Sequence, residues 1–209
     1  MKPWYALCSF AARCILRLLA PVTVHGTGNI PRDRNFILAS NHFSFFEPPL
    51  LGGFTPVELH FFAKKKLFEI PVLGPLITSL NAVPINRGST DLTGLNAAAD
   101  VLLRGGNLLI FPEGGRNKTG RLKDAKGGIG YLVMASKVPV IPVYIRNSNQ
   151  MLKCLRRQAR ISIAFGPPLE PDPQFFQLER KEAHRRIGAA VMDRIAALER
   201  ETLAIAGKQ

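Results

Sequence analysis

Five short runs of aliphatic and β-branched residues alternate with helix-like stretches along the chain of 209 residues. The runs cover residues 35–40, 59–63, 107–111, 138–145 and 160–165. A helical pattern at 91–104 ends at two glycines, and a long helix is expected from about residue 173. Its stripe, interrupted by Thr202, is expected to face the core and consists of Ile187, Val191, Ile195, Leu198 and Ile205. This alternation predicts an α/β fold with a mixed, mostly parallel β-sheet flanked by helices, in one domain over 22–209.

Residues 1–21 carry a different pattern, that of an N-terminal amphipathic helix ending at Pro21. At 100° per residue its apolar side chains fall on one arc, opposite Arg13 and Arg17. The arc consists of Trp4, Leu7, Cys8, Ala11, Cys14, Ile15, Leu18 and Leu19. The helix either associates with a membrane interface or packs this arc on the domain. No transmembrane span is expected, since the longest uncharged run, 70–86, holds only 17 residues and includes three prolines.

The positive charge of the chain limits the classes of molecule that it is expected to bind. Lys and Arg outnumber Asp and Glu by 28 to 15, which gives a net charge of +13 and an isoelectric point near 10.2. Such a balance favours a polyanion, either nucleic acid or an anionic membrane surface. Nucleic acid is not expected, because helix-turn-helix, zinc and RNA-recognition signatures are missing. Much of the charge lies in 116–160, where eleven basic side chains stand against Asp124. Three cysteines without a CxxC spacing exclude a disulfide framework and a cysteine zinc site, and suit a reducing compartment.

Polar residues directly after two of the apolar runs are the strongest candidates for a site, because sites in α/β sheets form at the carboxyl ends of strands. After 35–40 come Asn41 and His42, with Glu47 five residues beyond the histidine. A regular helix would place His42 and Glu47 about 140° apart, and Pro48 disfavours helix at Glu47. A turn would bring the pair together, so that the carboxylate holds the imidazole as a base. The alternative is that both residues are structural.

A glycine-rich loop follows the run 107–111. Glu113 and Arg116 flank Gly114 and Gly115, which permit tight turning and close approach of backbone N–H groups to an anion. Arg116 is suited to grip a phosphate, or else the loop is a hairpin-like turn stabilised by an ion pair.

Taken in order, these elements resemble the four sequence blocks of the glycerolipid acyltransferases, the family of the 1-acylglycerol-3-phosphate acyltransferases. Asn41-His42-x4-Glu47 resembles the first block, Asn-His-x4-Asp. Residues 63–74, running on to 85–87, resemble the second block. Residues 111–116, Phe-Pro-Glu-Gly-Gly-Arg, resemble the third, which is usually Phe-Pro-Glu-Gly-Thr/Ser-Arg. Residues 138–143 are similar to the fourth, and the resemblance covers about residues 22–165.

The resemblance implies a fold of the glycerol-3-phosphate acyltransferase type and a role for individual residues. His42 would be the general base on the hydroxyl of a lysophospholipid, oriented by Glu47. The acceptor phosphate would be bound by Arg87, Glu113, Gly114 and Arg116, with Lys64 and Lys126 as weaker candidates. The acyl donor would be acyl-CoA or acyl-ACP, the acylated form of acyl carrier protein, with no bound cofactor and no metal. The product from 1-acylglycerol-3-phosphate would be phosphatidic acid, a step of phospholipid biosynthesis.

Two positions depart from the family pattern and leave the acceptor open. Glu47 replaces an aspartate and is longer by one C–C bond, about 1.5 Å. Gly115 replaces a hydroxyl residue and removes a hydrogen-bond donor near the phosphate. Another lysophospholipid or a lyso-aminolipid therefore fits as well, and a non-catalytic lipid-binding protein is a further alternative. We expect the protein at an anionic membrane surface, peripheral or monotopic on the cytoplasmic face, with the uncharged runs 48–57 and 70–86 either lining an acyl tunnel or packed in the core.

Overall fold

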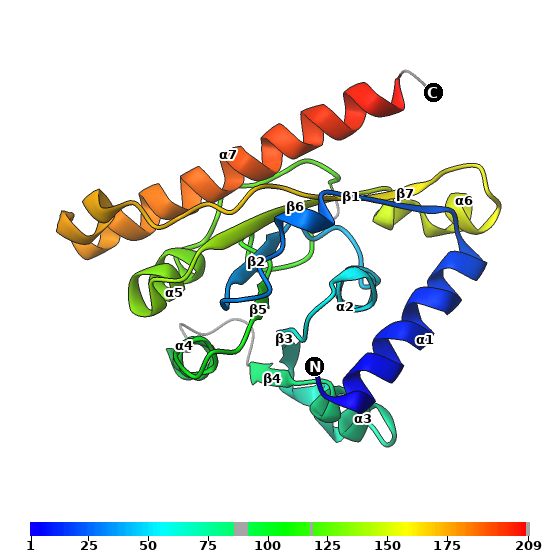
Figure 1. Ribbon diagram of the computed structural model, residues 1–209, viewed down its shortest axis with the longest axis horizontal. Helices are drawn as coiled ribbons and strands as arrows, with labels where there is room; N and C mark the ends of the chain where they lie inside the picture. The colour runs from blue at the N-terminus through cyan, green and yellow to red at the C-terminus, as the bar shows by residue number, and fades with distance from the viewer. Residues whose placement is uncertain (86–91, 118, 208–209) are drawn as a thin grey trace.

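A computed structural model describes residues 1–85, 92–117 and 119–207 and contains one seven-stranded sheet (Figure 1). The strand order is β1-β7-β6-β2-β5-β3-β4. The strands are β1 (Val22–His25), β2 (Ile37–Ser40), β3 (His60–Lys64), β4 (Ala82–Ile85), β5 (Leu108–Ile110), β6 (Val140–Arg146) and β7 (Ile161–Phe165). All neighbouring pairs are parallel except β6 and β7. The mixed, mostly parallel α/β fold predicted from the sequence is therefore confirmed.

The five predicted strands are all present, within two residues at each end, and two further strands were missed. The missed strands, β1 and β4, are the two edges of the sheet. Each has four residues and is only partly buried, so neither carries a strong apolar signal. Pro84 lies inside β4, a position that an edge strand tolerates because one side of its backbone has no strand partner.

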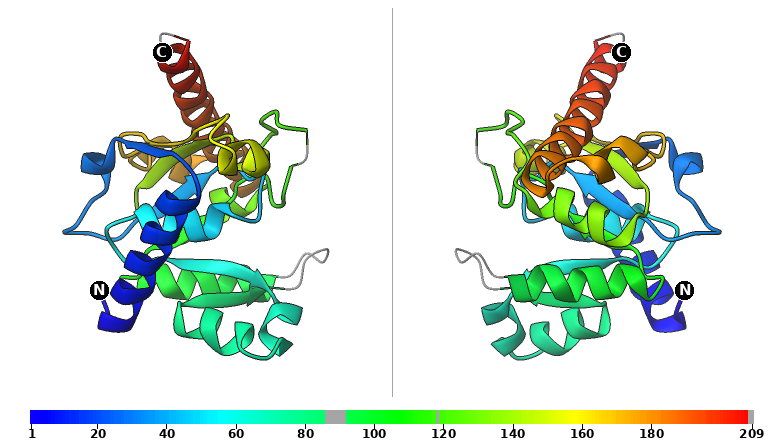
Figure 2. Two further views of the ribbon diagram at one scale, coloured as in Figure 1. Left: turned by 90° about the vertical axis from the view of Figure 1, so that its right-hand side faces the viewer. Right: turned by 90° about the vertical axis from the view of Figure 1, so that its left-hand side faces the viewer.

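Helices cover both faces of the sheet, which makes a three-layer fold (Figure 2). One face packs on α4 (Leu92–Leu103), α5 (Gly128–Ser136) and α7 (Arg180–Ala206). The other face packs on α1 (Pro3–Leu19), α2 (Glu47–Phe54) and α6 (Met151–Leu155), while α3 (Leu73–Ser79) lies beside β4. The predicted helix at 91–104 corresponds to α4. Short 3-10 turns occupy Thr27–Asn29, Lys65–Glu69, Ser148–Gln150 and Pro173–Gln177.

The C-terminal helix begins later than predicted. Pro173–Gln177 is a separate 3-10 turn, and α7 starts at Arg180, where the Glu179 side chain accepts hydrogen bonds from two backbone N–H groups of the first turn. The stripe from Ile187 to Leu198 is buried, as expected for a core-facing helix. Its last member, Ile205, is 49% exposed because the end of α7 projects beyond the sheet. Thr202, expected to interrupt the stripe, is buried and satisfies its hydroxyl on the carbonyl of Leu198.

The predicted N-terminal helix is present, but its apolar arc does not pack on the domain. The helix contacts α2 and its surroundings through the opposite side, where Tyr5, Ser9 and Leu16 are buried. On that side Arg13 Nε donates to the Gly53 carbonyl at 2.8 Å, and the Arg17 guanidinium lies over the Phe54 ring at 5.4 Å. The arc itself faces outward, with Trp4, Leu7, Ile15 and Leu18 each more than half exposed. Within the described ranges, no helix is long and apolar enough to cross a lipid bilayer.

Candidate active site

The loops that carry the candidate residues meet at one edge of the sheet. Strands β5 and β6 flank β2 and run parallel to it, so the three strands end on the same side. The chain therefore brings together residues 41–46 after β2, 111–117 after β5 and 147–148 after β6. The order of the strands changes direction around β2, and such a switch point leaves a crevice outside the carboxyl ends.

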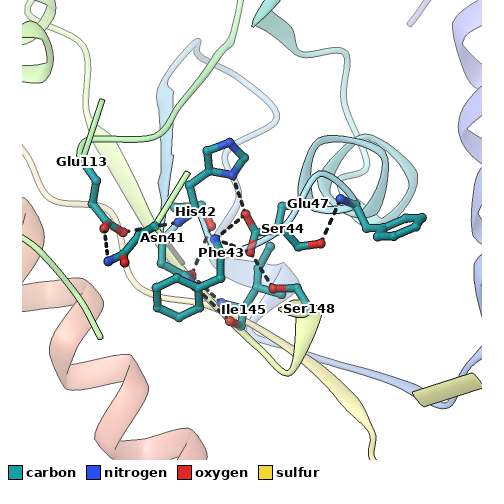
Figure 3. Close-up of polar contacts among 11 residues, drawn as sticks. Asn41, His42, Phe43, Ser44, Glu47, Glu113, Ile145 and Ser148 are labelled. Carbon is teal, nitrogen blue, oxygen red and sulfur yellow. Dashed lines mark hydrogen bonds and ion pairs between the residues drawn. The ribbon is translucent and has the colours of Figure 1, made fainter. Parts of the chain in front are cut away.

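His42 and Glu47 are joined directly by a turn. His42 Nδ1 lies 2.6 Å from Glu47 Oε2, and their side chains are 4% and 0% exposed (Figure 3). The backbone N–H of Phe43 donates to both carboxylate oxygens, at 2.9 and 3.0 Å. Glu47 is the first residue of α2, so the expectation that Pro48 would keep it out of a helix is wrong. The proline at the second helical position is tolerated because its missing N–H would have no partner in the first turn.

The geometry leaves the second ring nitrogen of His42 available for chemistry. An ionised carboxylate only accepts hydrogen bonds, so the proton of the contact lies on Nδ1 and Nε2 is an acceptor. Nε2 points away from Glu47 (Figure 3). The imidazole stacks on Phe111, with ring centroids 3.9 Å apart and an interplanar angle of 18°. A buried imidazole held in this tautomer can act as a general base.

A serine distant in sequence completes the surroundings of Glu47. Ser148 Oγ donates to Glu47 Oε1 at 2.6 Å, and both residues are fully buried. The loop of Ser148 is tied to the first motif by Asn41, whose side chain pairs with both backbone groups of Ile145. Those two hydrogen bonds measure 2.9 Å from Asn41 Nδ2 to the carbonyl and 2.7 Å from the Ile145 N–H to Oδ1.

Glu113 supports the histidine loop rather than pairing with Arg116. Its side chain points inward and accepts hydrogen bonds from Asn117 Nδ2 at 2.8 Å and from the His42 N–H at 3.4 Å. Asn117 in turn donates its backbone N–H to the His42 carbonyl at 2.6 Å. Burial raises the pKa of the Glu113 carboxyl, although these hydrogen bonds oppose the shift. Within the described residues no ion pair joins Glu113 to Arg116, so the alternative of a loop held by that pair is wrong.

The two glycines of this loop have different environments. Gly114 has φ +73°, and its N–H closes the turn on the Phe111 carbonyl at 2.9 Å, so that amide is already occupied. A Cβ at Gly114 would lie 2.5 Å from Cδ of Lys126, which crosses directly over the glycine. A Cβ at Gly115 would meet nothing within 4 Å. Gly114 thus admits the Lys126 side chain to the neighbourhood of His42.

The remaining basic candidates are distributed around the site. The guanidinium carbon of Arg116 lies 3.7 Å from the centroid of the Phe45 ring. Lys64 ends β3, is exposed, and lines the larger of the two cavities described below. Arg87 lies outside the described residues.

Two cavities meet at His42 and Phe111. The larger, about 550 Å³, runs between α1, α2, α3 and β3, and its lining is mostly apolar. The uncharged runs 48–57 and 70–86 contribute Pro48, Gly52, Leu73, Leu76, Ile77 and Leu80 to its wall. The smaller cavity, about 140 Å³, is lined by Gly114, Gly115 and Lys126 among others. The His42 imidazole therefore borders both an apolar cavity and a second cavity whose lining includes the cationic side chain of Lys126.

Sequence reasoning missed Ser148 and Asn117. Ser148 carried no local signal, because it is separated from Glu47 by about half the chain and meets it only through the neighbouring positions of β2 and β6. Asn117 directly follows the glycine-rich loop and was visible as a polar residue, but its two partners were not. Across the part of the chain that is described, no group of three or more His, Cys, Asp or Glu side chains could hold a metal ion.

A buried histidine held by a carboxylate, at the carboxyl edge of a mostly parallel sheet, is typical of an enzyme that takes a proton from its substrate. Comparison with known proteins makes this class specific. A model of the acyltransferase family matches residues 21–146. The 1-acyl-sn-glycerol-3-phosphate acyltransferase of Bacillus subtilis (strain 168) is 28% identical over 196 residues, 93% of this chain and 96% of that protein.

Two further relatives extend the comparison. The lyso-ornithine lipid O-acyltransferase of Pseudomonas aeruginosa is 35% identical over 126 residues, 60% of this chain and 48% of that protein. The crystal structure of the 1-acyl-sn-glycerophosphate (LPA) acyltransferase PlsC from Thermotoga maritima is similar with a TM-score of 0.69 and 29% identity. That similarity covers 90% of this chain and 78% of the Thermotoga chain. The chain therefore belongs to the acyltransferase family and is an O-acyltransferase.

Proposed function

We propose that the enzyme transfers a fatty acyl group from an acyl thioester to the free hydroxyl of 1-acylglycerol-3-phosphate, which yields phosphatidic acid. The thioester would be acyl-CoA or acyl-ACP, the acylated form of acyl carrier protein. The observation that carries the proposal is the His42–Glu47 pair placed where an apolar cavity and a cation-bearing cavity meet. The names of the Bacillus and Thermotoga relatives support the same acceptor.

The reaction follows from the free Nε2 of His42. It accepts the proton of the acceptor hydroxyl as the oxygen attacks the thioester carbonyl, and the carbonyl becomes a tetrahedral oxyanion. Collapse of this intermediate breaks the C–S bond, and the imidazolium returns the proton to the departing thiolate. The Glu47 carboxylate stabilises the imidazolium while it exists, because a positive charge in a buried site needs a partner.

The acceptor phosphate would lie beside the smaller cavity, with Arg116 and Lys126 as its cationic ligands. Lys126 lines that cavity, and Arg116 belongs to the loop that forms its rim. Glu113 and Gly114 would act indirectly: Glu113 by holding the His42 backbone, and Gly114 by admitting Lys126. Arg87 stays a candidate ligand from the sequence. The larger cavity would take an acyl chain, since its lining is apolar, and Lys64 at its wall would face the more polar end of the donor.

The exposed face of α1 supports attachment to a membrane surface. An outward arc of large apolar side chains on an amphipathic helix is the pattern of a helix lying in a bilayer interface. The basic segment 116–160 supplies a second attraction, which on anionic lipid amounts to about 1 kcal/mol for each basic residue near the surface. Arg156, Arg157 and Arg160 are exposed members of this segment, beside the exposed Leu152. We propose peripheral or monotopic binding at the cytoplasmic face.

One other acceptor has specific support. The Pseudomonas relative is named for a lyso-ornithine lipid, and Gly115 lacks the hydroxyl that the family pattern places next to the phosphate. Acylation of a lyso-aminolipid is therefore the second candidate.

An acyl-transfer assay tests both candidates. Purified enzyme is incubated with acyl-CoA or with acyl-ACP, the acylated carrier protein, and with 1-acylglycerol-3-phosphate, a zwitterionic lysophospholipid or lyso-ornithine lipid. We expect the highest kcat/KM with 1-acylglycerol-3-phosphate, and a loss of about 10²–10⁴-fold in His42→Ala, the usual contribution of a general base. Preference for lyso-ornithine lipid would select the second candidate. Equal turnover by His42→Ala and the unmodified enzyme would contradict the proposed mechanism.

A further inference from the structure

We infer that Ser148 is a positioning residue of this enzyme, which acts on His42 through the carboxylate of Glu47. The inference rests on the proposed acyl transfer, and it adds a residue outside all four sequence blocks. Ser148 is fully buried, and its hydroxyl oxygen lies 2.6 Å from Glu47 Oε1. A hydrogen bond from a hydroxyl to a carboxylate at this distance is of the strong, charge-assisted kind.

The two carboxylate oxygens of Glu47 have different side-chain partners. Oε2 faces His42 Nδ1, while Oε1 receives the Ser148 hydroxyl, and the Phe43 N–H contacts both. The terminal torsion of a glutamate side chain is intrinsically broad, so one contact to the imidazole does not fix the plane of the carboxylate. A second donor on the opposite oxygen does fix it. Ser148 thereby keeps Oε2 directed at Nδ1 and Nε2 directed at the substrate.

The position of Ser148 is itself held from several directions. Asn41 clamps the end of β6 through both backbone groups of Ile145. Asn147 then turns the chain with φ +62°, and its side chain donates to the Arg160 carbonyl at 2.8 Å. The thiol of Cys154 contacts the Asn147 carbonyl at 3.6 Å. The hydroxyl is thus delivered to Glu47 by a loop that is held on both sides.

The length of the carboxylate side chain matters for this contact. Glu47 is the first residue of α2, and its carboxylate reaches both His42 and Ser148 in the loop after β6. An aspartate would be shorter by about 1.5 Å and would not bridge both partners without a shift of the backbone. The glutamate and Ser148 therefore form one unit, and their effects on catalysis should not be additive.

Steady-state kinetics with 1-acylglycerol-3-phosphate test the inference. We expect Ser148→Ala to lower kcat about 10-fold, the scale of one charge-assisted hydrogen bond, with both KM values within about twofold of the unmodified enzyme. In the Glu47→Asp background, the same substitution should change kcat less than about threefold, because the bridge is already lost. The matched control is Ser136→Ala in α5, whose hydroxyl bonds only to the Leu132 carbonyl within its own helix and which should leave kcat unchanged.

Three outcomes would overturn the inference while leaving the acyltransferase function intact. These are an unchanged kcat in Ser148→Ala when His42→Ala is inactive, a loss that appears in KM instead of kcat, and an equal loss in the unmodified and Glu47→Asp backgrounds. If Ser148→Ala unfolds below the assay temperature, the near-isosteric Ser148→Cys serves instead, because a thiol is a weak donor. It should lower kcat in the same direction, and full activity of Ser148→Cys would contradict the inference.

Discussion

The guanidinium carbon of Arg116 lies 3.7 Å from the centroid of the Phe45 ring. Phe45 is 67% exposed, an unusual position for a large aromatic side chain, and it comes from the turn between His42 and Glu47. This cation–π contact places the proposed phosphate ligand against the turn that carries the proposed base, before any substrate is present. It also connects the first sequence block to the third.

Loss of this ring is expected to weaken binding of the anionic acceptor. Phe45→Leu keeps an apolar side chain but removes the π face, so the KM for 1-acylglycerol-3-phosphate should rise about 2- to 5-fold, the scale of an exposed cation–π contact, with little change in kcat. Phe45→Tyr should retain the wild-type KM. Equal KM values for the leucine and tyrosine variants in initial-rate measurements would contradict this role.

The two glycines of the third block provide a matched pair. Gly114→Ala places a Cβ at a positive φ and 2.5 Å from the Lys126 side chain, so we expect a loss of about 1–2 kcal/mol in the free energy of unfolding and a lower kcat/KM. Gly115→Ala meets no neighbour within 4 Å and should match the unmodified enzyme in both measurements. Denaturant unfolding and initial rates would decide, and equal behaviour of the two variants would speak against the loop geometry.

Glu113 should impose a pH dependence on stability. Its pKa in the folded protein is raised above the ordinary value of 4.5, mainly by burial. A carboxyl with a raised folded-state pKa contributes stability when protonated, and this contribution is lost as pH rises from 4.5 through the raised value. Relative to Glu113→Gln, the unmodified enzyme should therefore lose free energy of unfolding with rising pH over that window. Urea titrations at a series of pH values measure the difference, and a relative stability of the unmodified enzyme that grows with pH would have the wrong sign.

The outward arc of α1 should contribute to membrane binding whatever the lipid charge. Leu7 and Leu18 are 59% and 77% exposed, so replacing both by serine should weaken flotation with neutral and anionic liposomes alike. The control is Leu203→Ser near the end of α7, which removes a leucine that is 48% exposed and lies outside the arc. Unchanged flotation of the double variant would remove the assignment.

The basic segment should act on anionic lipid alone. Neutralising Arg156, Arg157 and Arg160 is expected to weaken binding to anionic liposomes and to leave binding to neutral ones unchanged, because the attraction is electrostatic. The two sets of variants therefore separate the apolar and the charged parts of the attachment.

Local sequence information was sufficient to predict the central strands and to single out the residues of the sequence blocks. The strands β2, β5 and β6 are buried on both faces and read as continuous apolar runs, whereas the half-buried edge strands β1 and β4 did not. The late start of α7 was missed because Asp172 caps a separate 3-10 turn and Glu179 caps the helix itself. The His42–Glu47 contact was left open, because a regular helix would hold the two side chains about 140° apart and the local sequence did not decide whether a turn joins them or both residues are structural.

By itself the sequence determined the fold class, the polar residues at the ends of the strands and the amphipathic character of α1. Those features depend on neighbours within a few residues. Only the tertiary structure decided that Ser148 meets Glu47, that Glu113 turns inward to the His42 backbone and that the apolar arc of α1 faces outward. Each of these depends on which strand lies beside β2 or on which side of a helix meets the domain. These contacts are determined by packing between residues far apart in the sequence, which produces no periodic pattern of apolar residues along the chain.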